Sequence, residues 1–361
     1  MRKIFFLILF QFTMVYGQVD LVKYLPENFS EKGDIDYTDY LQKGFDENDN
    51  LLLPNFPILI NAKGLNLKSN QIVSFQNSSI LIMKENDLTK YGMLNVINKD
   101  NVTINNATLI GDKDIHKGTK GEWGMGIKIL SSSNVFIKEP IIKKTWGDGI
   151  YIGELNVVEK RDISKKSFTN NKITIKGGVI EDCLRNGISI ISGIDIFIDG
   201  ITIKNMSTKA PRAAIDIEPN TKFNKIRNVS ITNVITRDNF NGIVIMLVNL
   251  IDTNAVDIGT VLIENHSDFN SKSSLVIANY ANKLERKDKL KSLKGEIAVV
   301  GSKYFGTKNV YKHKKMNLYN PKITFKNINY YSTKENSYVL SQDFNNQFKY
   351  NVENDPKVIC K

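Results

Sequence analysis

The chain has few of the residues that build metal centres or crosslinked scaffolds. Its 361 residues include two cysteines, Cys183 and Cys360, and three histidines. Two cysteines so far apart cannot form a disulfide-rich scaffold, and no cluster of His and Cys has the spacing of a zinc site. We therefore predict no metal centre of this kind and interpret Cys183 as a small buried residue.

Long apolar runs are equally scarce, apart from one at the start of the chain. Residues 1–17 consist of the charged Met1-Arg-Lys, an apolar run from Ile4 to Val15, and a small residue at Gly17. This order is typical of a secretory signal peptide, and the run is too short to span a bilayer comfortably. We expect a secreted or periplasmic protein with no membrane anchor once the signal is removed.

The formal net charge of +11 favours an anionic partner, either nucleic acid or an acidic polysaccharide. The lysines are scattered along the chain instead of forming a stripe, and export argues against nucleic acid. We expect no nucleic-acid partner and interpret the charge as compatible with an anionic glycan.

The repeated feature of the sequence is a short aliphatic strand preceded by Asn or Asp. It recurs at Asn101–Ile104, Asn134–Ile137, Asn171–Ile175, Asp195–Ile198 and Asn228–Ile231. A second series, which ends in Ile127, Ile150, Ile188, Ile215 and Ile243, has intervals of 23, 38, 27 and 28 residues. A period in the twenties with one enlarged step indicates a solenoid, and an insertion over residues 154–170 accounts for the step of 38.

Units this short, without helices between them, predict an all-β, single-stranded right-handed parallel β-helix. Tyr37, Leu41 and Phe45 lie four residues apart and predict an amphipathic helix that caps the first coil. We expect one domain over residues 18–361: a cap (18–50), regular coils (51–281) and less regular C-terminal coils (282–361). A β-sandwich is the competing fold, but its Asn-Gly hairpin signals occur here at one phase of the repeat.

The helix followed by Leu53-Pro54, the Asn-Val-x-Ile repeats and Gly147-Asp148-Gly149-Ile150 resemble the pectin-lyase-like superfamily of right-handed parallel β-helices. The resemblance covers most of the mature chain and implies a polysaccharide-active enzyme or a tailspike-like protein. The polygalacturonase set of paired aspartates, Gly-His-Gly and Arg-Ile-Lys is missing, as is the epimerase Asp-Pro-His motif. The resemblance therefore implies a fold and leaves the reaction open.

Aligning the five isoleucines as one inward column predicts which residues face outward beside each other. The next residue in each strand is Lys128, Tyr151, Ser189, Asp216 or Val244. Because side chains alternate along a strand, Glu218 is expected to point to the same side as Asp216. This pattern predicts one outward polar surface shared by several coils.

Asp148, Asp216, Glu218 and Arg185 are the predicted catalytic residues of this surface. Two carboxylates on one strand can act as acid and base on a glycosidic bond, and crowding raises the pKa of one of them. Arg185 would hold a second acid ionised. The plainer alternatives are a solvated acid pair, a turn role for Asp148, and pairing of Arg185 with Glu181 or Asp182.

The predicted substrate-binding residues surround these acids. Flat aromatic rings suit pyranose faces, whereas charged and hydrogen-bonding groups suit hydroxyl and acidic substituents. The set consists of Glu122, Trp123, Lys128, Trp146, Tyr151, Arg212 and the weakly supported His116. Core packing is the alternative for the two tryptophans.

These residues favour a glycoside hydrolase that acts on a polysaccharide or oligosaccharide. The first alternative is a polysaccharide lyase or uronan epimerase, in which Lys128 or Tyr151 abstracts the C5 proton and carboxylates bind Ca²⁺. The second is a glycan-binding β-helix without enzymatic activity. No cofactor is expected for the hydrolase.

Overall fold

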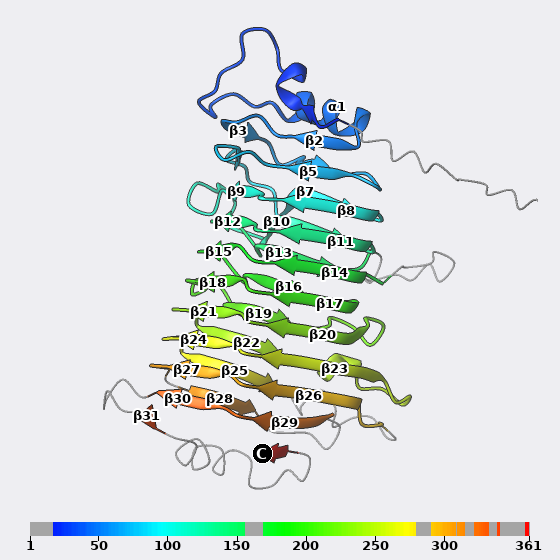
Figure 1. The fold of residues 1–361 in the computed structure, drawn as a ribbon, viewed down its shortest axis with the longest axis vertical. Helices are drawn as coiled ribbons and strands as arrows, with labels where there is room; N and C mark the ends of the chain where they lie inside the picture. Colours follow the sequence, from blue (N-terminus) through cyan, green and yellow to red (C-terminus); the bar gives the residue numbers. More distant parts are fainter. Residues whose placement is uncertain are drawn as a thin grey trace, which may run out of the picture.

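The computed structural model describes residues 17–155, 169–278, 290–307, 309–314, 321–331, 338–339 and 358–360. Its strands stack along one long axis, with the N-terminal helix at one end (Figure 1). The predicted signal peptide lies outside the described residues except for Gly17, and so does most of the insertion predicted over residues 154–170.

Three sheets run along this axis in the described part of the chain, and from β2 to β28 each coil contributes one strand to each sheet. Sheet A contains β1 (Val19–Asp20), β2 (Asn50–Leu52), β5 (Ile72–Ser74), β8 (Asp100–Asn105), β11 (Ser133–Lys138), β14 (Asn171–Lys176), β17 (Gly193–Asp199), β20 (Ile226–Thr232), β23 (Asp257–Glu264), β26 (Lys294–Val300), β29 (Lys322–Lys326) and β32 (Val358–Cys360). Sheet B contains β3 (Pro57–Ile60), β6 (Ile80–Met83), β9 (Thr108–Ile110), β12 (Ile141–Lys143), β15 (Val179–Glu181), β18 (Thr202–Lys204), β21 (Ile235–Arg237), β24 (Ser267–Phe269), β27 (Lys303–Phe305), β30 (Asn329–Tyr331) and β31 (Tyr338–Val339). Sheet C contains β4 (Leu65–Asn66), β7 (Lys90–Ile97), β10 (Trp123–Leu130), β13 (Ile150–Gly153), β16 (Ile188–Ile190), β19 (Ala213–Ile217), β22 (Asn241–Ile245), β25 (Ser273–Ala278) and β28 (Asn309–Lys314).

The predicted parallel β-helix is confirmed. Neighbouring strands pair in parallel in all three sheets, and the described exception is the antiparallel pair β30–β31. The Asn-led strands predicted from the sequence form sheet A, and the Gly-Ile series forms sheet C. After residue 281, β26 to β30 continue the stack, with one register shift in the β23–β26 pair between Asp257 and Thr260.

The inner column of isoleucines has the predicted register. Ile127, Ile150, Ile188, Ile215 and Ile243 are consecutive Cα partners in sheet C, and all five are fully buried. Each buried Ile side chain stabilises the fold by roughly 1.5–3 kcal/mol relative to an exposed one. A continuous apolar column therefore fixes the register between coils.

Asparagine and aspartate are placed at the corners of the coils for a conformational reason. Asn101, Asn134, Asp195 and Asn228 are the second or third residues of their sheet A strands, just after the corner, and all have φ between 53° and 57°. Asn and Asp tolerate this left-handed conformation better than other non-glycine residues. Asn228 Nδ2 also donates to Asp195 Oδ1 of the preceding coil at 2.9 Å. In the Asn171 coil, Lys172 takes the left-handed position, one residue later than the pattern predicts.

The predicted capping helix is α1 (Thr38–Glu47), which covers the first coil. Tyr37, Leu41 and Phe45 are buried against the core, as their spacing predicts. The short 3₁₀ helix η1 (Leu21–Tyr24) packs on α1 at Gly44, where a Cβ would lie 2.5 Å from a Leu21 methyl carbon. A second 3₁₀ helix, η2 (Val248–Leu250), lies in a later coil.

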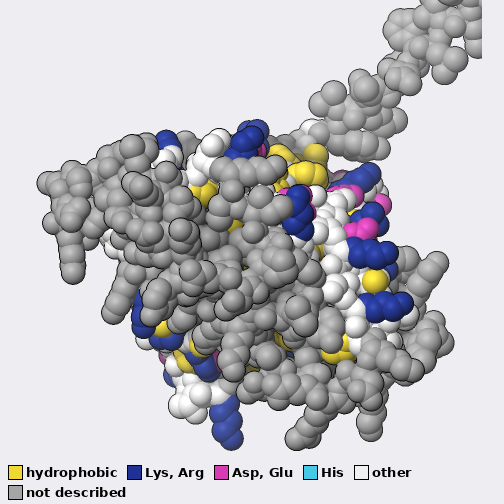
Figure 2. Space-filling view, turned by 90° about the horizontal axis from the view of Figure 1, so that it is seen from below, with side chains coloured by type: hydrophobic (Ala, Val, Ile, Leu, Met, Phe, Trp, Pro, Cys, Tyr) yellow, Lys and Arg dark blue, Asp and Glu magenta, His cyan; other side chains and the backbone are white. Residues whose placement is uncertain are grey.

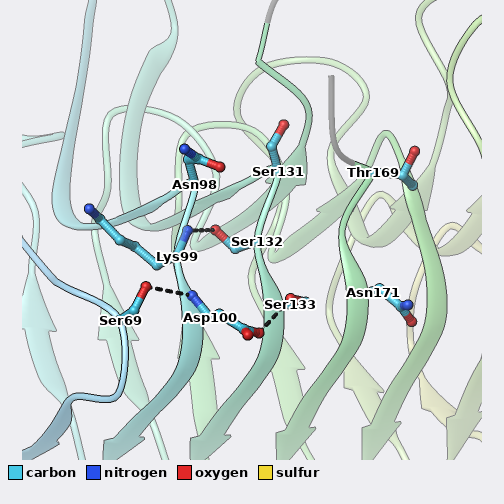
Figure 3. Close-up of a pocket in the computed structure, with 9 residues that line it drawn as sticks. All are labelled: Ser69, Asn98, Lys99, Asp100, Ser131, Ser132, Ser133, Thr169 and Asn171. Atoms are coloured by element: carbon cyan, nitrogen blue, oxygen red, sulfur yellow. Dashed lines mark hydrogen bonds between the residues drawn. The ribbon is translucent and has the colours of Figure 1, made fainter. Parts of the chain in front are cut away.

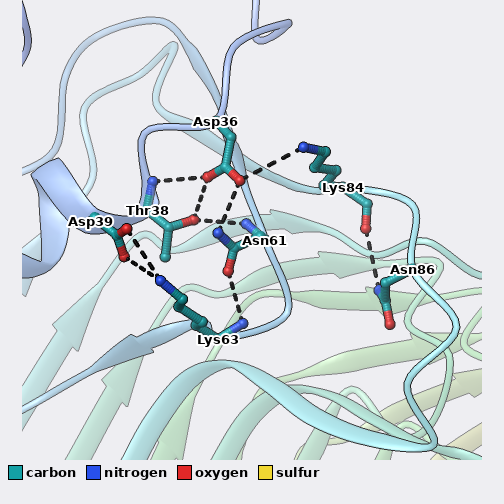
Figure 4. A network of polar contacts seen from close by, with 7 residues as sticks. All are labelled: Asp36, Thr38, Asp39, Asn61, Lys63, Lys84 and Asn86. Atoms are coloured by element: carbon teal, nitrogen blue, oxygen red, sulfur yellow. Dashed lines mark hydrogen bonds and ion pairs between the residues drawn. The ribbon is translucent and has the colours of Figure 1, made fainter.

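Asp36 joins the cap to the first coils through a polar network (Figure 4). Its Oδ1 accepts from the Thr38 backbone N–H at 3.0 Å and from Thr38 Oγ1, while Oδ2 accepts from Asn61 Nδ2 at 2.9 Å. Burial opposes ionisation, but the hydrogen bonds from Thr38 and Asn61 and the charge of Lys84 together lower the pKa of Asp36. The network thus holds an ionised carboxylate at the start of α1.

The described helices include none that is long and apolar enough to span a membrane. Seen from the C-terminal end, described Lys and Arg side chains lie among Asp and Glu side chains along the rim (Figure 2). In this view the charges of both signs are interspersed.

We predict that Asp36→Ala lowers the free energy of unfolding by about 1–2 kcal/mol at pH 7, because the backbone N–H and hydroxyl of Thr38 at the start of α1 and the Asn61 amide lose their acceptor. The folded-state pKa of Asp36 is lowered, so its contribution is present above the ordinary Asp value of about 3.9 and disappears as pH falls through the folded value. Urea denaturation at pH 7 and at acid pH measures this difference. Asp39→Ala, at an exposed ion pair on the same helix, is the control; an equal loss in both variants would contradict the role of Asp36.

Candidate active site

The register of sheet C brings the predicted outward residues side by side. Lys128 pairs with Tyr151, Tyr151 with Ser189, Ser189 with Asp216, and Asp216 with Val244. The row predicted from the sequence is therefore present, and it runs through five consecutive coils.

The row is not the exposed polar surface that the sequence predicts. Asp148 is 0% exposed and Asp216 is 1% exposed, and Asn186 and Ser189 are also buried. Distant segments contribute to this enclosure: Lys209, on the turn before β19, donates to Gly121 O and pairs with Glu122 at 2.7 Å. The prediction of an exposed surface is wrong, and so is the alternative of a solvated acid pair at Asp216.

Asn186 connects the two buried aspartates. Its backbone N–H donates to Asp148 Oδ1 at 3.2 Å, and its Nδ2 donates to Asp216 Oδ2 at 3.2 Å and to Ser189 Oγ at 3.1 Å. Its Oδ1 accepts from the Ala213 backbone N–H at 2.9 Å, which fixes the orientation of the amide. Asn186 thus donates hydrogen bonds to two acids that lie two coils apart.

Burial is the largest cause of the raised pKa values of Asp148 and Asp216. It raises the pKa of Asp148, and the guanidinium of Arg185 opposes the rise. Burial also raises the pKa of Asp216 well above its ordinary value, and the negative charges of Glu218 and Asp148 raise it further. A carboxyl group that keeps its proton at higher pH has the property required of a general acid.

Three polar atoms at the centre of this cluster are buried without a hydrogen-bond partner among the described residues. They are Asp148 Oδ2, Asp216 Oδ1 and Arg185 Nε. Buried polar groups are hydrogen-bonded in the great majority of cases, so unpaired acceptors beside an unpaired donor indicate a place for a polar ligand or water.

Arg185 joins the acids to Glu122. Its Nε lies 3.8 Å from Asp148 Oδ1, and its Nη1 lies 3.5 Å from Glu122 Oε1. The alternative pairing with Glu181 or Asp182 is not observed: Glu181 pairs with Lys143 and Lys204, and Asp182 with Lys113. Glu122 therefore forms ion pairs with both Arg185 and Lys209 at the edge of the cluster.

The two tryptophans have different surroundings. Trp123 is 41% exposed and lies beside Lys90, whose Nζ is 5.8 Å from the centre of the ring. Trp146 is partly buried against the core and stacks on His116, with ring centroids 4.1 Å apart. Trp123 therefore offers the more accessible flat surface near the acids.

Lys128 and Tyr151 lie in the same row, and both have perturbed acidity. Burial, followed by the charge of Lys90, lowers the pKa of Lys128. Burial and the negative charge of Asp148 raise the pKa of Tyr151 to about 12. Arg212 lies apart from them, with its guanidinium 3.6 Å from the centre of the Phe240 ring.

Sequence reasoning missed the buried Asp112 and did not select Asn186 as a site residue. Asp112 is the partner of His116, at 2.7 Å, and it lies in a turn that the strand repeat does not mark. Asn186 could have been found as the residue between Asp148 and Asp216 in the column. Within the described residues, no group of three or more His, Cys, Asp or Glu side chains could hold a metal ion.

A polar pocket of about 330 Å³ lies elsewhere, at the corner between sheets C and A (Figure 3). Many of its lining groups are bonded to one another: Asp100 N donates to Ser69 Oγ, Lys99 N to Ser132 Oγ, and Ser133 Oγ to Asp100 Oδ1. None of the predicted site residues lines it. We therefore place the candidate site at the acid cluster.

The fold is shared with solved structures of low sequence identity. A tailspike protein from the Acinetobacter baumannii bacteriophage Fri1, a capsular polysaccharide depolymerase, aligns with a TM-score of 0.61 and 16% identity over 87% of this chain and 54% of its own. An iota-carrageenase from A. fortis aligns with a TM-score of 0.60 and 12% identity over 88% of this chain and 87% of its own. The chain has the parallel β-helix of tailspikes and carrageenases.

A third similar structure, the tailspike of the E. coli bacteriophage HK620 in complex with a pentasaccharide, has a TM-score of 0.62 and 9% identity over 87% of this chain and 57% of its own. Similar folds thus include carbohydrate-active enzymes and a protein bound to carbohydrate.

Sequence comparison is less informative. No protein-family model matches the chain. The uncharacterized protein YclG of Bacillus subtilis (strain 168) is 28% identical over 218 residues, which is 57% of this chain and 35% of the relative. The chain thus spans about a third of the length of this curated relative.

We predict that Asp216→Asn increases the free energy of unfolding at pH 7 by roughly 1–2 kcal/mol. The folded-state pKa of Asp216 is raised, so any stability linked to its proton is present at acid pH and is lost as pH rises through the folded value. Asn carries no charge and still presents an oxygen to Asn186 Nδ2.

Denaturation of parent and variant between pH 3 and pH 8 measures this effect, which should vanish below the ordinary Asp value of about 3.9. Asp39→Asn is the control, because that carboxylate is exposed. A variant that is less stable than the parent at pH 7 would show that the ionised carboxylate stabilises the fold.

Proposed function

We propose that the chain is an exported glycoside hydrolase that cleaves a polysaccharide or oligosaccharide at the Asp148–Asp216 cluster. One observation supports this most: two buried carboxyl groups are bonded to the same Asn186, and each keeps one oxygen unpaired. Glycoside hydrolysis requires two carboxyl groups that flank the scissile bond in different protonation states.

The environments of the acids suggest their roles. Asp216 retains its proton most strongly, because it is buried next to the charges of Glu218 and Asp148, and we assign it as the general acid. Asp148 has Arg185 beside it, which favours its ionised form and suits a base or nucleophile. Glu218 lies next to Asp216 and is the alternative to Asp148 in that role.

The surrounding groups suggest how a glycan would be held. Trp123 is exposed and can stack on a pyranose ring, while Lys90, Lys128 and Arg185 can pair with acidic substituents. Because Asp148 and Asp216 are almost completely buried, the substrate must displace some of the groups that cover them. This requirement would exclude bulk water from the reaction.

The alternative is a polysaccharide lyase, and one specific observation favours it. Lys128 is partly buried and its pKa is lowered, so a neutral amine that can abstract a proton is more accessible there than at an exposed lysine. Tyr151, its neighbour in the row, would assist. A lyase forms an unsaturated sugar that absorbs ultraviolet light, whereas a hydrolase forms new reducing ends without that absorbance.

We predict that a panel of glycans incubated with the protein yields new reducing ends from at least one substrate. Asp216→Asn and Asp148→Asn should each lower turnover by about 10²–10⁴-fold, the usual contribution of a positioned acid or base, whereas a loss of that size in Glu218→Gln instead of Asp148→Asn would assign the base to Glu218. Glu264→Gln, on a strand of sheet A, is the matched control and should retain full turnover.

Intact turnover in both acid variants would overturn the hydrolase assignment. Ultraviolet-absorbing product that is lost in Lys128→Ala would establish the lyase alternative. Binding without either product would indicate a glycan-binding protein.

A further inference from the structure

Asp112 is the centre of a buried polar network that the proposed chemistry does not use. It lies in the turn after β9 and is fully buried. Tyr91 Oη donates to its Oδ1, while Asn86 Nδ2 at 2.8 Å and His116 Nδ1 at 2.7 Å contact its Oδ2. Asn86 and Tyr91 lie before and at the start of β7, whereas His116 lies in the same loop as Asp112, so the carboxylate ties this loop to the preceding coil.

The network fixes the His116 ring in place. A hydrogen bond to Asp112 assigns the ring proton to Nδ1, and the side chain is completely buried. Nε2 has no partner among the described residues and faces Gly118, where a Cβ would lie only 2.8 Å away. The ring therefore has little room to rotate or shift.

His116 in turn holds Trp146. The two rings are 4.1 Å apart and inclined by 15°, and the indole also packs against the core. Gly147 is the next residue in the sequence. Its Cα lies so close to neighbouring backbone that a Cβ would be 2.7 Å from Glu122 O. Its carbonyl accepts from the Arg185 backbone N–H at 3.1 Å. The next residue is Asp148, so the indole packs beside the turn that carries the acid, where Thr145 Oγ1 also donates to Gly147 O and the Asp148 backbone N–H donates to Met125 Sδ.

Packing alone would not require a carboxylate and an imidazole at this position. Burying a carboxylate and an imidazole costs desolvation energy, and apolar residues of similar volume would usually be as stable or more stable. Both oxygens of Asp112 are hydrogen-bonded, however, and such a network specifies one arrangement of its members, because each donor has a fixed direction. The network is therefore suited to setting an orientation.

We propose that Asp112 and His116 are positioning residues that hold the Trp146 ring, and through it the turn at Gly147, so that Asp148 stays against Arg185 and Asn186. This inference rests on the proposed function in one respect: the orientation of Asp148 matters for catalysis only if Asp148 takes part in the reaction.

The test compares His116→Ala, which removes the ring, with His116→Phe, which keeps a flat ring against the indole without the bond to Asp112. Lys117→Ala is the control, because that side chain is exposed on the same loop. Hydrogen exchange is followed at the backbone amides of residues 146–149. Trp146 emission is recorded in a Trp123→Phe background, where it is the remaining tryptophan.

We expect His116→Ala to accelerate exchange at these amides by about tenfold and to make Trp146 emission easier to quench with acrylamide. His116→Phe should recover only part of both signals, because it keeps a ring against the indole but loses the bond to Asp112, and Lys117→Ala should match the parent. On a cleaved glycan, His116→Ala should lower kcat by about tenfold to a hundredfold with little change in KM, as expected for a misplaced acid. The kcat of His116→Phe should fall between those of His116→Ala and the parent.

Unchanged exchange and emission in His116→Ala would overturn the proposal, whatever the activity of the protein. Altered exchange with unchanged kcat, or a rise in KM alone, would also overturn it, because His116 would then not act through Asp148. If the parent cleaves no glycan, the hydrolase assignment fails, while the exchange and emission measurements still decide whether His116 holds the turn.

Discussion

The register between successive coils is the constraint on which the rest of the structure depends. Hydrogen bonds between parallel strands and the buried column from Ile127 to Ile243 fix each coil against the one before it. A slip of one residue would turn every side chain of a strand to the opposite face. This register alone places Asp148, Asn186 and Asp216 in adjacent coils, although they are far apart in the sequence.

The same packing buries the acid cluster, and this burial costs free energy of folding. Asp148 and Asp216 are removed from water, and the described contacts leave one oxygen of each unpaired. Proteins break the rules of polar satisfaction mainly at functional sites and compensate elsewhere. Here the apolar ladders and the corner asparagines stabilise the solenoid independently of the cluster. The fold can therefore tolerate charges that its own stability does not require, which is what a catalytic site needs.

The sequence alone predicts the fold and the neighbours in the row, but not the environment of the acids. Two signals are local in the sequence: the alternation of apolar residues along each strand, and the recurrence of residues such as Asn101 or Gly149 at a fixed position before it. The strands and their register follow from these signals. The burial of Asp216 depends on segments that are remote in sequence. Asp112 was missed because no repeat marks its turn, and because its partners Tyr91 and Asn86 lie more than 20 residues earlier in the sequence.

The central claim is that Asp148 and Asp216 form one buried, interacting pair. Carbon-13 NMR titration of aspartate side-chain carboxyls, assigned with Asp148→Asn and Asp216→Asn, measures this directly. The account predicts that both groups titrate above the ordinary value of about 3.9, and that Asp148→Asn lowers the pKa of Asp216. Independent titration of both carboxyls near the ordinary value would contradict the account.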